Sequence, residues 1–521
     1  MGLLRSASIF SGLTLVSRIF GLIRDQIIAI VFGAGAGLDA FWVAFKIPNF
    51  MRRLFAEGAF SQGFVPVIGE YKVRQDDTAV RQLISRVSGT LALVVLGITV
   101  AGIVVFPWLI LHFGPKVVTN QHKLVLTAEM LVLTLPYILF ISLTSLAGGV
   151  LNTYKRFAVP AFTPVFLNLC IIASALWLAP RMPAGDQVVA LAWGVLAAGI
   201  VQLGFQLPFL AKLGFLTWPR WGFNDPGVQR IMRLMGPAIL GSMVTQINLL
   251  VDLLVAYVVL PDGSVSWLTY SDRLVEFPLG VFGIAISTVI LPSLSQHHAQ
   301  TDSDEFAKTL DWGIRWALLI ALPATAGLVM LAGPLMTTLF NYGAFKQHDV
   351  VMAQMSLFAY ASGLLAFIMV KVLAPAFYSR QDTRTPVRIA VVAMLANIIL
   401  IATLVIPWIH LDYPAPHAGL AIATSLSAYA NAIMLFLTLR RQGVYRRLPG
   451  GGRFLFQLGG ALALMLVVLI FAVPGLSHWL AWSAGHRALM LLTWVSVCAA
   501  TYFAGLYLFG FRLGAFRAQH A

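Results

Sequence analysis

Long apolar runs follow one another along the chain, separated by short stretches rich in charged and turn-forming residues. A helix that crosses a membrane needs about 20 apolar residues, and these runs are long enough to supply them. The pattern therefore predicts an all-α polytopic membrane protein with fourteen transmembrane helices. The expected helices cover residues 5–31, 36–68, 81–112, 123–152, 160–179, 187–211, 227–258, 265–296, 308–340, 350–378, 385–408, 418–441, 453–474 and 485–510.

The composition of the 521-residue chain agrees with this pattern, because 59% of the residues are hydrophobic and only 11% are charged. Soluble globular proteins carry roughly 25% charged residues, so a water-soluble protein is excluded. Fourteen spans also leave no room for a large extramembrane domain. The two cysteines, Cys170 and Cys498, are too few for a disulfide scaffold or a metal centre.

The charge balance gives the expected orientation. The chain has 35 Lys and Arg residues against 20 Asp and Glu residues. In the loops and at the ends of the predicted spans, 21 basic residues fall on one side of the membrane and 5 on the other, namely Lys116, Lys123, Arg181, Lys346 and Arg487. Because basic loops stay in the cytoplasm, both termini are expected there, in agreement with an even number of spans. The basic surplus thus reports topology, and no nucleic-acid partner is expected.

Several charged residues remain inside the predicted spans. Each charge at bilayer depth costs about 2.5–3.5 kcal/mol on insertion scales unless it faces protein or water. In the first span, Arg18 and Asp25 share one helix face with small and hydroxyl residues, and Arg24 lies on a flanking row. In the second span, Arg52 projects off a polar stripe, and Pro48 should bend the helix. That stripe comprises Asp39, Lys46, Asn49, Arg53 and Glu57. In the eighth span, the charged residues are Asp272, Arg273 and Glu276.

These charges have two interpretations. Spacings of four and three residues suit structural ion pairs for Arg53 with Glu57 and for Arg273 with Glu276. Arg18, Arg24 and Arg52 have too few carboxylates on their own helices, and such guanidinium groups suit a phosphate or pyrophosphate ligand. The sum of charges does not decide between them. Six basic intramembrane residues are formally balanced by Asp25, Asp39, Glu57, Asp252, Asp272 and Glu276.

The chain also contains a weak internal repeat. The tripeptide at 64–66 matches the one at 290–292 at an offset of 226, and Tyr-Lys-Arg at 154–156 matches Tyr-Ser-Arg at 378–380 at an offset of 224. Two parallel six-helix copies are expected when a transporter rocks two lobes about a central site. We therefore expect an N-lobe over 1–220, a C-lobe over 221–445, and an appended helix pair with a cytoplasmic C-terminus over 446–521.

Five segments make the chain resemble the MurJ (MviN) family of lipid II flippases, and the resemblance runs nearly from end to end. They are SRIFGLIRD at 17–25, DAFWVAFKIPNFMRRLFAEGAFSQGFVP at 39–66, GPAILG at 236–241, DRLVEFP at 272–278 and KVLAPAFYSRQDTRTP at 371–386. The resemblance implies the fold of the multidrug/oligosaccharidyl-lipid/polysaccharide exporter superfamily. It also implies lipid II as substrate, an undecaprenyl pyrophosphate that carries the disaccharide-pentapeptide precursor of peptidoglycan. The implied location is the bacterial inner membrane, and the implied role is in cell-wall synthesis.

The resemblance assigns roles to matching residues. It implies that Arg18, Arg24, Arg52 and Arg273 bind the pyrophosphate, with Asn49 and Arg53 in the same substrate site, and that Asp39 helps to gate the periplasmic side. The remaining expected gating or structural charges are Asp25, Lys46, Glu57, Asp272 and Glu276. The last two helices would house the polyprenyl tail. Some relatives place a sodium ion in the second lobe; Asp252 and Asn397 match, but Ile401, one turn further on, offers no oxygen ligand.

We expect transport by alternating access without catalysis, with no cofactor other than a possible sodium ion and with the membrane potential as an energy source. Membrane lipids and cell-wall synthesis proteins are the expected partners. An exporter of another polyprenyl-linked saccharide, or of drugs on the same fold, is the alternative function. A drug exporter should have a cavity dominated by carboxylates and aromatics, unlike the arginine-bearing first two spans. A membrane enzyme needs a carboxylate cluster or a nucleophile with a base, and the ten histidines lie mostly in or beside loops.

Overall fold

A computed structural model describes residues 3–53, 60–300, 302–445 and 450–512. These residues are helical with connecting turns and contain no strand. Eleven helices among them are long and apolar enough to cross a membrane, which confirms a multi-pass membrane protein. The predicted spans at 5–31, 36–68 and 227–258 do not meet that criterion over the described residues. The fourteen-span count therefore stays a prediction.

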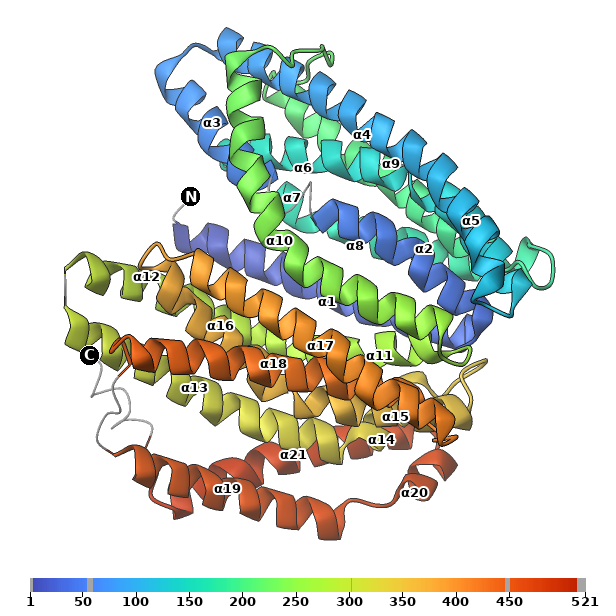
Figure 1. Ribbon diagram of the computed structural model, residues 1–521, viewed down its shortest axis with the longest axis vertical. Coiled ribbons are helices and arrows are strands. Elements are labelled where there is room, and N and C mark those ends of the chain that lie inside the picture. Colours follow the sequence, from blue (N-terminus) through green and yellow to red (C-terminus); the bar gives the residue numbers. More distant parts are fainter. Residues whose placement is uncertain (1–2, 54–59, 301, 446–449, 513–521) are drawn as a thin grey trace. The chain divides into compact units, whose positions relative to one another are not determined.

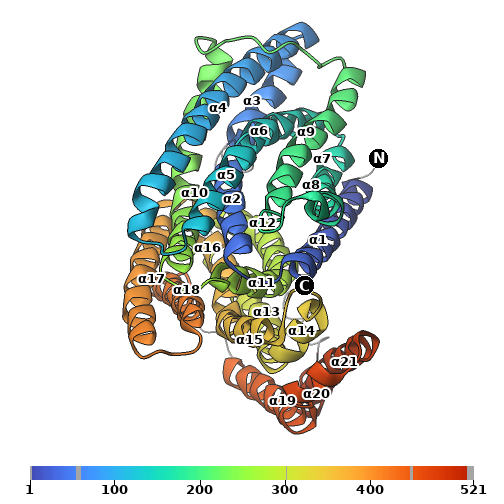
Figure 2. The same cartoon turned by 90° about the vertical axis from the view of Figure 1, so that its right-hand side faces the viewer.

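The chain divides into two compact units, and the first contains residues 1–266. Its helices are shown in Figures 1 and 2: α1 (Leu3–Phe32), α2 (Ala36–Arg52), α3 (Phe60–Arg74), α4 (Asp77–Phe113), α5 (Gln121–Thr134), α6 (Tyr137–Thr153), α7 (Ala158–Phe162), α8 (Pro164–Ala173), α9 (Val189–Lys212) and α10 (Pro226–Val258). A buried apolar cluster joins α3, α4, α6 and α10 through residues such as Phe64, Leu83, Val150 and Ile231. Because α10 packs against α2, α3 and α4, it belongs to this unit, and the boundary between the units differs from the predicted lobe boundary at 220.

The second unit contains residues 267–521. Its helices are α11 (Ser264–Pro278), whose first residues belong to the first unit, α12 (Ile284–Ala299), α13 (Ser303–Met330), α14 (Ala332–Phe340), α15 (Gln347–Ser362), α16 (Leu364–Tyr378), α17 (Arg384–His410), α18 (Pro416–Arg441), α19 (Gly451–Ala472), α20 (Leu476–Ala481) and α21 (Ala484–Leu508). A second apolar cluster packs α19 and α21 against α13, and Figure 1 shows these last helices in red beside α13 and α14. The short helix α20 was not expected from the sequence.

Helix boundaries repeat along the chain at one constant spacing. Equivalent boundaries are 226 residues apart in five helix pairs: the ends of α1 and α10, the ends of α2 and α11, and the starts of α4 and α13, of α5 and α15, and of α7 and α17. This regularity supports an internal duplication far better than the few matching residues do.

The offset of 224 predicted for the second match is wrong. After α6, Lys155 N donates to Asn152 O, and after α16, Gln381 N donates to Tyr378 O. Lys155 and Gln381 both adopt a φ of 61°, so the two helices end in the same left-handed turn 226 residues apart. The Tyr-x-Arg pattern gives the wrong offset, because the equivalent positions in the two copies are marked by the turn geometry and not by the identity of these residues.

Gly89 in α4 provides a direct test of how the loop after α9 packs against this helix. The loop that follows α9 runs against α4, where Arg220 N donates to Ser85 O at 2.9 Å, and a Cβ on Gly89 would lie 2.2 Å from Arg220 O. Gly89→Ala should therefore lower the unfolding temperature, because overpacking costs about 1–3 kcal/mol and outweighs the gain in helix propensity of about 1 kcal/mol. Gly97, in the same helix, has open space at its Cβ position. Gly97→Ala should leave the unfolding temperature unchanged or raise it, and an equal response of both variants in thermal unfolding would contradict the packing.

Candidate functional site

Arg24 is buried in α1, which packs against α7 and α8. Its Nε and Nη2 donate to Asp25 Oδ1 at 2.9 and 2.5 Å, and its Nη1 donates to Asn168 Oδ1 at 3.1 Å. Asn168 Nδ2 donates in turn to the carbonyl oxygen of Ser17 at 3.2 Å. Arg24 therefore has a partner beyond its own helix, because an amide from α8 complements Asp25. Asn168 links α8 to α1 and holds a candidate ligand residue.

Arg18 is in a different situation on the same helix. Its side chain is partly exposed, and it has no hydrogen-bond or ion-pair partner among the described residues. Ile19 and Ile23 on this helix are 49% and 37% exposed. A guanidinium group without a partner among the described residues has its donors available for an anionic ligand.

The polar stripe of α2 is partly exposed around its proline. Arg52 Nε donates to Asn49 Oδ1 at 2.8 Å, so Arg52 has an amide neighbour that its own helix supplies. Lys46 and Arg53 are partly exposed, and Pro48 lies inside the helix as expected. Glu57, the expected partner of Arg53, lies outside the described residues, and its pairing stays a prediction.

In the second unit, α11 carries the other group of charges. Arg273 Nη1 and Glu276 Oε2 form an ion pair at 3.0 Å across one helical turn, which confirms the predicted structural pairing. Both side chains stay partly exposed, at 36% and 41%. Asp272 is also partly exposed. Arg273 can therefore exchange its pairing for a ligand without leaving a buried charge behind.

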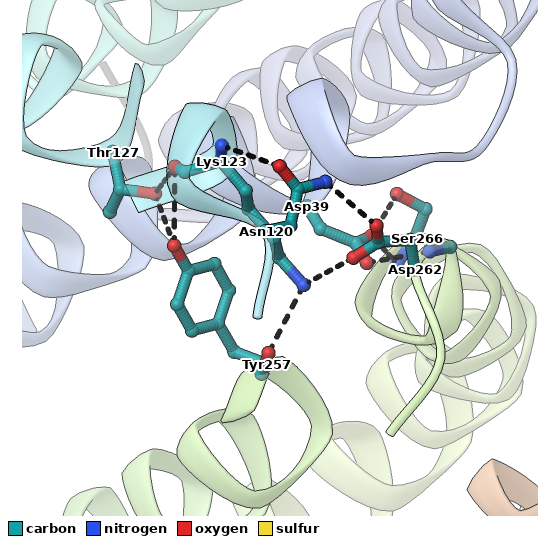
Figure 3. Close-up of polar contacts among 8 residues, drawn as sticks. Asp39, Asn120, Lys123, Thr127, Tyr257, Asp262 and Ser266 are labelled. Atoms are coloured by element: carbon teal, nitrogen blue, oxygen red, sulfur yellow. Dashed lines mark hydrogen bonds and ion pairs between the residues drawn. The ribbon is translucent and has the colours of Figure 1, made fainter. Parts of the chain in front are cut away.

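Asp39, near the start of α2, accepts three hydrogen bonds (Figure 3). Its carboxylate is fully buried. Oδ2 accepts from Gly263 N at 2.7 Å, and Oδ1 accepts from Ser266 N at 2.9 Å and from Ser266 Oγ at 2.7 Å. Gly263 and Ser266 lie at the beginning of α11, so a side chain from α2 caps the N-terminus of another helix. A negative charge is favourable there because the first N–H groups of a helix lack partners within it.

The residues proposed for a sodium ion are both buried. Asp252 lies in α10 and is 8% exposed, and Asn397 lies in α17 and is 0% exposed. The two residues belong to different units. Across the part of the chain that the structure describes, no three His, Cys, Asp or Glu side chains gather as metal ligands. The sodium ion therefore stays a prediction.

Comparison with known proteins gives one consistent result. A family model described as "Lipid II flippase MurJ" matches residues 28–492. A probable lipid II flippase MurJ of Vibrio cholerae is 47% identical over 98% of this chain and 97% of its own length. The lipid II flippase MurJ of Burkholderia cenocepacia is 41% identical over 99% of both chains.

Solved structures show the same relationship. A lipid II flippase MurJ in an inward closed conformation matches with a TM-score of 0.78 and 25% identity, over 96% of this chain and 98% of that one. An inward-facing multidrug resistance transporter of the MATE family matches with a TM-score of 0.66 over 84% of this chain and 98% of that one. At 15% identity, this second match indicates only a shared fold.

Proposed function

The chain belongs to the MurJ family of lipid II flippases, and from this membership we propose that it moves lipid II from the cytoplasmic to the periplasmic leaflet of the bacterial inner membrane by alternating access. It acts as a transporter and not as an enzyme. The single observation that carries the chemistry is Arg18, a partly exposed guanidinium group in an apolar helix with no partner among the described residues.

The proposed architecture has two six-helix lobes and an extra pair of helices, with fourteen spans and both termini in the cytoplasm. The 226-residue repeat of helix boundaries supports two copies, at 1–220 and 221–445. The remaining residues, 446–521, contain α19 and α21, which pack against each other and against α13. Their outer side chains include Val467, Ile470 and Phe471, at 52%, 59% and 86% exposure. Such an apolar surface suits a polyprenyl tail, which cannot enter a charged cavity without a large desolvation cost.

Arg18 is the proposed primary contact of the pyrophosphate. Paired oxygens on a phosphate accept two parallel N–H donors from one guanidinium group, a geometry that lysine cannot supply. Arg24 reaches the same ligand only if phosphate oxygens replace Asp25 and Asn168 as its acceptors. Arg52, Arg53 and Arg273, with Asn49, are the proposed further contacts, because all are partly exposed and lie on α2, directly after it or on α11. Asp25, Glu57, Asp272 and Glu276 would balance this positive charge, whereas Lys46 would add to it.

Complementation in cells tests the function. The gene should restore growth and normal shape to a bacterium depleted of its own lipid II flippase, because a cell wall cannot be extended without the precursor. An empty vector is the negative control. Failure of the wild-type protein to complement, despite its presence in the membrane in normal amounts, would contradict the proposed substrate.

The energy source is a separate part of the proposal. Moving one charge through 100 mV is worth about 2.3 kcal/mol, so the membrane potential can bias the exchange between the two states. A sodium ion held by Asp252 or Asn397 is the second possible driver. Vesicles that carry a potential, a proton gradient or a sodium gradient separately should show faster transport with the potential. Acceleration by the sodium gradient alone, lost in Asp252→Asn, would assign the role to sodium instead.

A further inference from the structure

The turn between α10 and α11, residues 259–263, is anchored by a lysine from the start of α5 (Figure 3). Lys123 Nζ donates to Asp262 Oδ1 at 2.8 Å and to the carbonyl oxygen of Tyr257 at 3.1 Å. Asn120 Nδ2 donates to the other carboxylate oxygen of Asp262 at 3.1 Å. Thr127 Oγ1 lies 2.6 Å from the hydroxyl oxygen of Tyr257, one turn further along α5. Two successive turns of α5 thus hold the end of α10 and the loop that follows it.

Holding this loop with Lys123 requires the burial of a positive charge, which is energetically costly. The residue is 1% exposed, whereas the Asp262 side chain is 41% exposed. Burying an ammonium group costs several kcal/mol, which is about what good partners return, so such pairs contribute little net stability. The ring of Tyr257, 4.4 Å from Nζ, and an electrostatic interaction with Asp39 complete the surroundings of the charge. A buried pair with little net stability is better explained by what it positions.

The internal repeat separates this role from a general requirement of the fold. The sequence Gln121-His122-Lys123 recurs as Gln347-His348-Asp349, 226 residues further on and also at the start of a helix. The lysine is therefore replaced by an acid in the second copy, where Asp349 accepts from the backbone N–H of Lys346. Starting this helix does not require an ammonium group. In the first copy, the lysine instead pairs with Asp262. The next residue, Gly263, donates its N–H to Asp39.

We propose that Lys123 is a positioning residue for the gate at Asp39: by fixing Asp262, it holds the N–H groups of Gly263 and Ser266 in place for the Asp39 carboxylate. The inference rests on the proposed alternating access, in which the start of α11 must leave α2 when this end opens. Lys123 then sets how often the end opens, without contacting substrate. Loss of the ammonium group should shift the protein toward the open state.

Ser264 offers a reporter for that opening. It is fully buried at the first position of α11, and its Oγ has no hydrogen-bond partner among the described residues. Ser264→Cys, in a chain with Cys170 and Cys498 replaced by serine, places a thiol that reacts only when the gate opens. The labelling reagent is a neutral, membrane-impermeant polyethylene glycol maleimide. Because it is uncharged, removing a charge from the protein does not change the electrostatic attraction between protein and reagent. It is added to the periplasmic side of sealed cells.

Lys123→Met should raise the labelling rate of this reporter about tenfold or more, equivalent to about 1.4 kcal/mol in the opening equilibrium. Lys123→Arg, which can still contact Asp262, should stay within about threefold of the parent. Lys116→Met is the matched control, because Lys116 is exposed and lies only seven residues before Lys123, in the segment that precedes α5. Equal labelling of Lys123→Met and Lys116→Met would overturn the proposal.

Asp262→Asn keeps the test decisive if Lys123→Met does not reach the membrane. Its amide oxygen can still accept from the buried Lys123 Nζ, so folding should be tolerated, but the ion pair is lost and labelling should also speed up. An unchanged labelling rate in this variant would overturn the proposal as well. Lipid II transport by the parent is measured separately. A parent that opens but does not transport lipid II contradicts the proposed function and leaves the role of Lys123 standing.

Discussion

Replacing Arg18 with alanine should abolish lipid II transport while the protein remains folded and inserted. The guanidinium group has no partner to lose among the described residues, so its removal leaves none of their groups without a hydrogen bond. Two charge-assisted hydrogen bonds to a pyrophosphate are worth about 3–6 kcal/mol, so transport should fall by about 10²-fold or more. The measurement is complementation of a flippase-depleted cell, with membrane insertion checked by immunoblot and folding by thermal unfolding in detergent.

Two variants make this result specific. Arg18→Lys keeps the charge but loses the planar pair of donors, so it should give intermediate activity. Arg74→Ala removes a basic residue whose side chain is 74% exposed and that pairs with Glu70, and it should complement fully because exposed pairs contribute little. Full complementation by Arg18→Ala would contradict the pyrophosphate contact.

Replacing Asp39 with alanine should open the end of the protein that Asp39 closes. The change leaves the N–H groups of Gly263 and Ser266 and the Ser266 hydroxyl without their acceptor. Each buried donor without an acceptor costs about 1–3 kcal/mol, so the closed state should lose about 3 kcal/mol, or about 10²-fold in its population ratio. Labelling of the Ser264→Cys reporter should rise accordingly, by more than in Lys123→Met.

Asp39→Asn separates charge from shape. Its amide oxygen can still accept from the N–H and hydroxyl of Ser266, whereas its NH₂ group then faces the N–H of Gly263, so labelling should fall between that of the parent and that of Asp39→Ala. Transport should drop in both variants because alternating access requires a closed state at this end. Labelling at the parent rate together with normal complementation by Asp39→Ala would contradict the gate.

Much of the fold could be predicted from the sequence because apolar length and loop charge depend on local composition. The expected helices correspond to helical segments wherever the structure describes them, and the first repeat match gave the true offset. The second match gave the wrong offset because it depended on residue identity alone, whereas the left-handed turns at Lys155 and Gln381 define the equivalent positions. The short helix α20 was missed because its six residues follow a proline-glycine pair and carry no helical periodicity.

The candidate site was only partly predictable, because several of its contacts join residues that are far apart in the sequence. The Arg273–Glu276 pair follows from spacing alone, but the amide that holds Arg24 comes from a residue 144 positions away. Lys123 and Arg487 were counted as loop charges. Both are buried, and Arg487 donates to backbone carbonyls that include those of Trp479 and Leu480. Sequence position near a helix end did not reveal that tertiary contacts enclose these two side chains.

Reconstitution shows whether this chain carries lipid II across a bilayer by way of Arg18. Purified wild-type protein, Arg18→Ala and no protein are placed in liposomes with lipid II in the inner leaflet and an impermeant lipid II-binding probe outside. We expect the fraction of lipid II reached by the probe to rise with time only for the wild type. Equal probe binding in wild-type and protein-free vesicles, or in wild-type and Arg18→Ala vesicles, would contradict it.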